Sequence, residues 1–132
     1  MALSALPALA SARRAAGSTQ LNFTHWTVHA SGGGASVRQK VPPGGTFRIC
    51  SSAKLTELDA HYRSSLPSGT SVHTVWKVTG QTANSEPGKA FPSGYFYVAN
   101  PHGLPLGTWT IKVVRHGTKL GATSIDVVKE HC

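Results

Sequence analysis

Acidic residues are scarce in this sequence, and charged residues of either sign are few. Only five residues are Asp or Glu, and charged residues make up 14% of the 132-residue chain, against about 25% in typical soluble domains. This composition argues against helices with faces rich in Glu and Lys. Long apolar runs are also missing. No segment approaches 18 consecutive apolar residues, so the sequence predicts no transmembrane helix.

Motifs of catalysis are absent as well. The sequence contains neither GxSxG nor CxxC, and its two distant cysteines lack the spacing of zinc ligands. Ser and His residues abound, but a hydrolytic triad also needs an orienting acid. We expect Glu57 and Asp59, two positions apart, to lie on opposite faces of a strand or to align poorly on a helix. The sequence therefore predicts no enzymatic activity and no cofactor.

Turn residues are plentiful. Fourteen Gly and eight Pro residues, together with many Ser and Thr, indicate short strands joined by turns. The length fits one domain, and no βαβ alternation or internal repeat is visible. The fold class predicted is therefore all-β, an antiparallel sandwich of seven to eight strands, with an eight-stranded barrel as the alternative. Segments of strand length are 21–30, 37–41, 46–51, 72–79, 95–100 and two within 109–128.

Two segments depart from simple alternation. In 21–30, the first two apolar residues have one parity and the later Trp26 and Val28 have the other. A kink or bulge near Thr24 would bring both sets to one side. In 52–71, the spacing of Leu55, Leu58 and Tyr62 is helical, so we expect one or two helical turns there.

Residues 109–128 predict a β-hairpin with a definite register. His116 and Gly117 stand where a two-residue turn needs positive φ. Gly121 lies where a one-residue bulge would correct a parity mismatch in the second strand. With that bulge, six apolar residues share the core face: Trp109, Ile111, Val113, Leu120, Ile125 and Val127.

The hairpin also carries a family resemblance. Residues 106–127, LGTWTIKVVRHGTKLGATSIDV, resemble the last two strands of bacterial extracytoplasmic immunoglobulin-like (fibronectin III-like) domains, which often end in pGxW/Yxvxvyx-nGkxxgsxxfxV. Trp76 is similar to the core Trp of such folds, whereas Ile111 stands about where antibody domains have their second Cys. The resemblance implies an immunoglobulin-like antiparallel β-sandwich. It implies no activity, because this architecture serves adhesins, chaperones, inhibitors and copper carriers.

The ends of the chain suggest export. Residues 1–12 contain a short apolar stretch that ends in Ala-Ser-Ala, the small-x-small form of a signal-peptidase site, although the usual positive n-region is missing. The segment is thus either a signal-peptide remnant or an Ala-rich tail, with a flexible lead at 13–20 and the sandwich at 21–132. Cys50 and Cys132 fit one disulfide in a secreted or extracytoplasmic protein, and two free thiols are the alternative.

Binding partners are predicted from charge and aromatic residues. The net charge of +8 favours anionic partners or simply aids solubility. Basic residues are scattered without a run of five, so nucleic-acid binding is disfavoured. Aromatic rings can stack on sugars or anchor a protein, while Trp76 and Trp109 belong to alternating core faces. The predicted binding residues are Trp26, Tyr62, Tyr95 and Tyr97, with the basic residues Arg115 and Lys119.

Seven histidines raise the question of a metal site. His25 and His29 would face one side of a strand about 13 Å apart, which is too far for them to share one ion. The alternative is a site between strands, in which one of them binds an ion together with a residue such as His73. We assign no metal ligand from the sequence. The function predicted is a secreted, non-catalytic structural or interaction module that binds a protein or a cell-envelope partner. The alternatives are an accessory domain that binds carbohydrate or an anionic polymer, and a copper- or zinc-binding extracytoplasmic protein.

Overall fold

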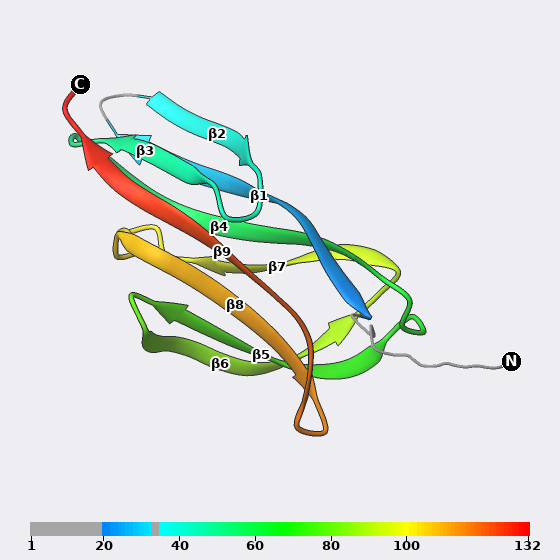
Figure 1. Ribbon diagram of the computed structural model, residues 1–132. Helices are drawn as coiled ribbons and strands as arrows, with labels where there is room; N and C mark the ends of the chain where they lie inside the picture. The colour runs from blue at the N-terminus through cyan, green and yellow to red at the C-terminus, as the bar shows by residue number, and fades with distance from the viewer. Residues whose placement is uncertain (1–19, 33–34) are drawn as a thin grey trace, which may run out of the picture.

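Two β-sheets pack face to face in the computed structural model, which describes residues 20–32 and 35–132 (Figure 1). The predicted leader at 1–12 and most of the predicted lead at 13–20 lie outside the described residues. Strands are the only regular elements in the described ranges. They are β1 Leu21–Gly32, β2 Ala35–Val41, β3 Thr46–Cys50, β4 Ala53–Ser64, β5 Thr70–Val78, β6 Gln81–Ala90, β7 Ser93–Ala99, β8 Gly107–Arg115 and β9 Thr118–Glu130.

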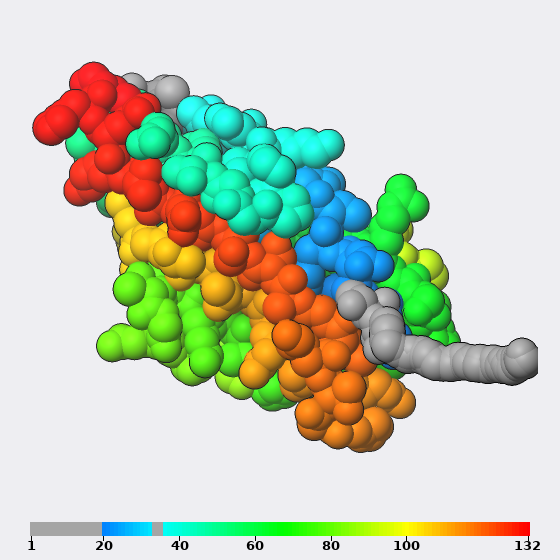
Figure 2. Space-filling view, in the orientation of Figure 1, coloured from blue at the N-terminus to red at the C-terminus, as the bar shows by residue number. Residues whose placement is uncertain are grey.

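One sheet has the strand order β2-β1-β4-β7 and the other has the order β3-β9-β8-β5-β6. All neighbours pair antiparallel except β3 and β9, which run parallel. The predicted all-β sandwich is confirmed, with nine strands among the described residues in place of seven to eight. Figure 2 shows the side of the molecule on which β3, β9 and β8 form adjacent bands, with the β8–β9 turn projecting at one end. Within the described residues, no helix is long and apolar enough to cross a membrane.

The prediction of helical turns in 52–71 is wrong, because these residues contribute the long strand β4. The register between β1 and β4 shifts at Thr56, where β4 has one extra residue. The bulge lets Leu55 and Leu58, three apart, both point into the core, where each is at most 1% exposed. An irregular strand thus reproduces the spacing of a helix.

Strand β6 was not expected, because its sequence QTANSEPGKA reads as a loop. It forms an edge strand that pairs only with β5. An edge position tolerates Pro87, since one side of the strand needs no backbone donors. Thr79 and Gly80, both with positive φ, form the tight turn that joins β5 to β6.

The β8–β9 hairpin has the predicted form. His116 and Gly117 have φ of 51° and 78°, and the register shifts by one residue between Val113 and Val114, opposite Leu120 and Gly121. The six apolar residues assigned to the core face are all buried, none more than 5% exposed. The irregularity expected near Thr24 is confirmed as well, since the β1–β4 register shifts between Phe23 and His25.

Three tryptophans join the two sheets in the core. Trp26 from β1 packs edge to face on Trp76 from β5, with ring centroids 5.8 Å apart. Trp76 in turn packs on Trp109 from β8, at 6.3 Å. The indole of Trp26 donates a hydrogen bond to the carbonyl of Ser124, and that of Trp109 to the carbonyl of Pro105. The indole nitrogens of Trp26 and Trp109 therefore both have a hydrogen-bond partner within the protein.

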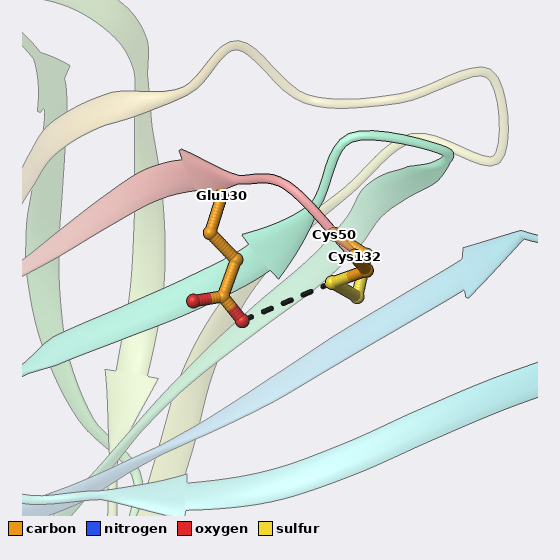
Figure 3. Close-up of side chains that lie close together, drawn as sticks. All are labelled: Cys50, Glu130 and Cys132. Carbon is orange, nitrogen blue, oxygen red and sulfur yellow. Dashed lines mark hydrogen bonds between the residues drawn. A yellow bond between two sulfur atoms is a disulfide. The ribbon is translucent and has the colours of Figure 1, made fainter.

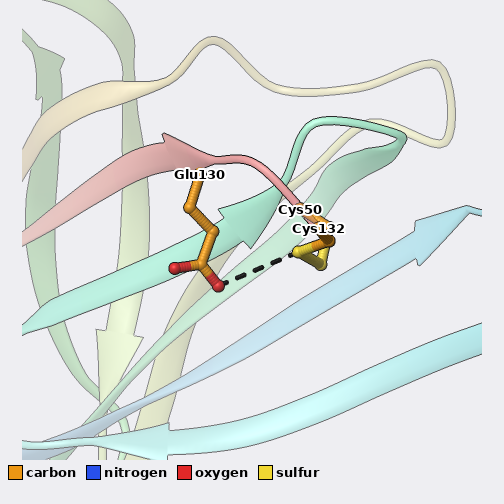
Figure 4. Close-up of a disulfide and its surroundings, with 3 residues drawn as sticks. All are labelled: Cys50, Glu130 and Cys132. Atoms are coloured by element: carbon orange, nitrogen blue, oxygen red, sulfur yellow. Dashed lines mark hydrogen bonds between the residues drawn. A yellow bond between two sulfur atoms is a disulfide. The ribbon is translucent and has the colours of Figure 1, made fainter.

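A disulfide joins Cys50 at the end of β3 to Cys132 just beyond β9, so the predicted bridge is confirmed. Figure 3 shows the carboxylate of Glu130 beside it, with Oε2 3.9 Å from Cys132 Sγ. A disulfide sulfur carries no hydrogen, so this is a contact without a donated proton. Figure 4 shows the same bridge, with the ends of β3 and β9 next to it.

Candidate functional site: the outer face of the four-stranded sheet

Polar side chains cover the outer face of the β2-β1-β4-β7 sheet. Residues of a strand alternate between its two faces, so the strands that bury Trp26 and Leu58 in the core send the residues between their core positions outward. We call this outer surface the polar face. Its members are His25, Thr27 and His29 of β1, Arg38 and Lys40 of β2, Glu57, Asp59 and His61 of β4, and Tyr95 and Tyr97 of β7.

The strand register arranges these side chains in rows across the sheet. Three pairs face each other between β1 and β4: His25 with His61, Thr27 with Asp59, and His29 with Glu57. Each row continues onto an edge strand: Arg38 beside His29, Lys40 beside Thr27, Tyr95 beside His61, and Tyr97 beside Asp59. Opposite residues in adjacent strands are close enough for their side chains to interact. Residues about 30 positions apart in sequence thus form one surface.

The bulge in β4 lies next to the His29–Glu57 row of this surface. The extra residue Thr56 donates a hydrogen bond from Oγ1 to the carbonyl of His29, at 3.1 Å. Along β1, the bulge comes after the His29–Glu57 pair, which keeps the register of the Thr27–Asp59 and Val28–Leu58 pairs. Bulges are common beside functional sites. Here the regular register before the bulge brings a histidine and two carboxylates together.

Asp59 is buried although it lies on the outer side of the sheet. The residue is 5% exposed, and His29 Nε2 lies 2.9 Å from its Oδ2. Its second oxygen, Oδ1, is buried and has no hydrogen-bond partner among the described residues. The Oε2 atom of Glu57 lies 3.7 Å from the same His29 nitrogen. The pKa of Glu57 is raised, mainly by its hydrogen bond with the Asp59 side chain, then by burial and by the negative charge of Asp59.

A second cluster on the polar face contains His25 and His61, in the row next to Thr27 and Asp59. The imidazole rings of His25 and His61 stack with centroids 4.2 Å apart, and the His61 Nε2 and Thr27 Oγ1 atoms are 2.9 Å apart. The pKa of both histidines is lowered, first by burial, and further by Lys40 for His25 and by His25 for His61. Both rings therefore favour the neutral form more than a free imidazole does, and a neutral imidazole offers one donor and one acceptor.

Two tyrosines form the exposed aromatic part of the polar face. Tyr95 is 51% exposed and Tyr97 is 56% exposed. Their ring centroids are 6.1 Å apart, and the ring of His61 lies 5.1 Å from that of Tyr95. Exposed aromatic rings flanked by hydrogen-bonding groups suit a ligand with both apolar and polar surfaces.

The other residues predicted for binding lie elsewhere. Trp26 and Tyr62 are buried in the core, at most 2% exposed, so their rings offer no surface to a ligand. Arg115 and Lys119 flank the β8–β9 turn in the five-stranded sheet, on a different layer from Tyr95 and Tyr97.

The histidine combination considered from the sequence is not formed. His73 belongs to β5 in the other sheet, where its Nε2 lies 2.7 Å from Ser85 Oγ. It cannot join His25 or His29 at one ion. The groups that do converge are His29, Glu57 and Asp59, whose candidate ligand atoms all lie within 4.8 Å of one another. Cys50, Glu130 and Cys132 are also close, but the disulfide removes both thiolates.

The carboxylate pair was missed at the level of sequence. The expectation that Glu57 and Asp59 lie on opposite faces of a strand is wrong, because residues two apart on a strand share a face. The signal was available in the alternation of Glu57, Asp59 and His61 with buried residues. This alternation was overlooked because the spacing of Leu55 and Leu58 indicated a helix.

A groove of about 730 Å³ runs between β6 and β7 on the open side of the sandwich. Its lining includes the apolar residues Trp76, Phe96 and Val98, together with Tyr95 and Tyr97, which also belong to the polar face. Tyr95 and Tyr97 are therefore shared by the groove and the polar face.

Comparison of the sequence with protein-family models and with curated proteins finds no match.

Proposed function

We propose that this protein is an exported, non-catalytic binding module that holds a glycan on its polar face. The observation that carries the proposal is the pair of exposed rings, Tyr95 and Tyr97, set beside the polar groups of Asp59 and His61. Sugar rings present apolar C–H faces and polar hydroxyl edges. Aromatic rings stack on the first, and neighbouring donors and acceptors bind the second.

An acidic glycan of the cell envelope suits the charge of the chain. Arg38 and Lys40 are exposed along the β2 side of the polar face, and the whole chain carries a net charge of +8. Cationic side chains on the same sheet face as a stacking platform, here at its opposite edge, attract carboxylate, sulfate or phosphate groups on a polymer that spans the face. The two acidic side chains of the face are already engaged with His29, so they oppose such a ligand less than free carboxylates would.

Export and family are part of the same proposal. The Cys50–Cys132 disulfide is typical of proteins that fold in an oxidising compartment. The small-x-small sequence at the end of residues 1–12 supports removal of a leader. The pattern of the β8–β9 hairpin supports membership of the bacterial extracytoplasmic, fibronectin III-like domains.

The test is chromatography of the purified protein on immobilised heparin and on immobilised teichoic acid, in buffer with EDTA. We expect retention of the wild-type protein and its loss in the double variant Tyr95→Ala/Tyr97→Ala. Phe91→Ala is the matched control, because Phe91 is 43% exposed but lies in the turn between β6 and β7.

Two results would overturn the proposal. The first is a lack of retention on either column at low salt. The second is retention that the tyrosine variants keep and that moderate salt abolishes, since this would indicate screened attraction to the whole basic surface without a specific site.

A further inference from the structure

His29, Glu57 and Asp59 have the composition of a metal site. Imidazole nitrogen with carboxylate oxygen is a ligand set used by Zn²⁺ and other first-row transition metals. The residues come from two adjacent strands held in register, and Thr56 adds a hydrogen bond from its hydroxyl to the His29 carbonyl beside the site. The site is thus built on sheet backbone, which holds ligands more firmly than a loop.

The distances match those between ligands of one ion. Zinc bonds to nitrogen and oxygen are about 2.0–2.2 Å long, so ligand atoms of a tetrahedral site lie about 3.3 Å apart. The His29 Nε2 atom is 2.9 Å from Asp59 Oδ2 and 3.7 Å from Glu57 Oε2, which brackets this separation. All three ligand atoms lie within 4.8 Å of one another. Small side-chain rotations would therefore suffice to admit an ion.

The buried carboxylate of Asp59 gives independent support. Its side chain is only 7% exposed, and Oδ1 has no partner among the described residues. A buried carboxylate oxygen without a hydrogen bond costs free energy. A cation bound to the carboxylate group would offset that cost, and it would also separate the negative charges of Asp59 and Glu57.

We propose that His29, Glu57 and Asp59 bind one divalent transition-metal ion of the Zn²⁺ class on the polar face. Three protein ligands leave a fourth position open for water or for a ligand oxygen. The site lies beside Tyr97, which is opposite Asp59 in the register, so a ligand on the tyrosines can reach the open position. The metal site does not depend on the glycan proposal.

The experiment is isothermal titration of tag-free protein with Zn²⁺, without glycan and in a non-chelating buffer. We expect one ion per chain and a micromolar or tighter Kd. Each of His29→Gln, Glu57→Gln and Asp59→Asn should weaken binding about tenfold or more, the scale of loss seen when a metal site is disturbed. His73→Gln and Glu86→Gln are the controls, because both residues lie in the five-stranded sheet.

Thermal unfolding gives a second readout that separates a lost site from a lost fold. Zn²⁺ should raise the Tm of the wild-type protein and of both controls, because a ligand that binds only the native state stabilises it. At the same Zn²⁺ concentration it should raise the Tm of folded His29→Gln and Glu57→Gln clearly less, in proportion to their weaker binding. These two residues are partly exposed, so their variants keep the test available even if Asp59→Asn unfolds.

Two outcomes would overturn this assignment. One is binding of Zn²⁺ no tighter than millimolar. The other is tight binding that His29→Gln and Glu57→Gln both retain, since the ion would then sit elsewhere. Glycan retention in EDTA tests the first proposal and zinc titration without glycan tests this one, so either can fail without the other.

Discussion

Cys50 ends β3, and Cys132 lies two residues beyond the end of β9, so the disulfide between them locks the one parallel strand pair in the described chain. Parallel pairing lacks the tight turn that holds an antiparallel hairpin together. Here the two strands are separated by most of the domain, with a sequence separation of 82 between the cysteines. The disulfide therefore joins two paired strands that no short loop connects.

Removal of the disulfide should destabilise the domain strongly. On the chain-entropy model, closing a loop of this size contributes about 3–5 kcal/mol. We expect Cys50→Ala/Cys132→Ala to lose that much free energy of unfolding in urea while it keeps the far-UV spectrum of the folded chain. Dithiothreitol should destabilise the wild-type protein similarly and leave the double variant unaffected. A loss below about 1 kcal/mol would contradict this role.

Trp76 should be the most costly aromatic residue to truncate. It is 1% exposed and contacts tryptophans from both sheets, so Trp76→Ala leaves a large cavity. We expect a loss of about 3–5 kcal/mol in urea unfolding. Tyr97→Ala is the control, since its ring is exposed and its removal should change stability by about 0.5 kcal/mol or less. Similar losses in the two variants would show that the tryptophan cluster does not hold the sheets together.

Gly121 should tolerate no side chain. A Cβ atom at this position would meet the backbone carbonyl of Leu21 on β1, and strand pairing prevents that backbone from moving away. We expect Gly121→Ala to cost about 2–3 kcal/mol, as overpacking does. Gly117→Ala, which meets open space but has φ of +78°, should cost about 1 kcal/mol. Urea unfolding measures the loss of unfolding free energy in both variants. A larger loss in Gly117→Ala than in Gly121→Ala would be inconsistent with the packing of β9 on β1.

Acid should destabilise the domain through His25 and His61. Their pKa values are lowered from the ordinary 6.5 by burial and by nearby positive charge. Below pH 6.5 the unfolded imidazoles take up protons that the folded ones resist, so the free energy of unfolding falls as the pH decreases through this range. The raised pKa of Glu57 acts in the opposite direction at lower pH, because the folded state then holds the extra proton.

Urea unfolding at pH 7.5, 6.5 and 5.5 measures this effect. We expect the decline between pH 7.5 and 5.5 to be smaller in His61→Gln than in the wild-type protein, and unchanged in His73→Gln, which lies in the other sheet. Equal declines in wild type and His61→Gln would mean that other groups control the acid response.

The sequence by itself determined the features that depend on neighbours along the chain. The two-residue turn at His116 and Gly117, the bulge at Gly121 and the six-residue core face of the last hairpin all follow from parity and positive φ. The same reasoning located the irregularity near Thr24 in β1. These features are local, because a hairpin brings together residues that are already close in sequence.

Only the tertiary structure decided the candidate site. His29 meets Glu57 and Asp59 through β1–β4 pairing over about 30 residues, in a regular register that ends at the bulge at Thr56. The sequence indicated a helix at that point, since a bulged strand and a helix place apolar residues at the same spacing. Which aromatic residues face solvent was likewise decided by packing: Tyr62 was buried against Phe23 and Phe96, whereas Tyr95 and Tyr97 remained exposed on the edge strand. Such choices depend on which sheet covers each face, and that is a property of the whole fold.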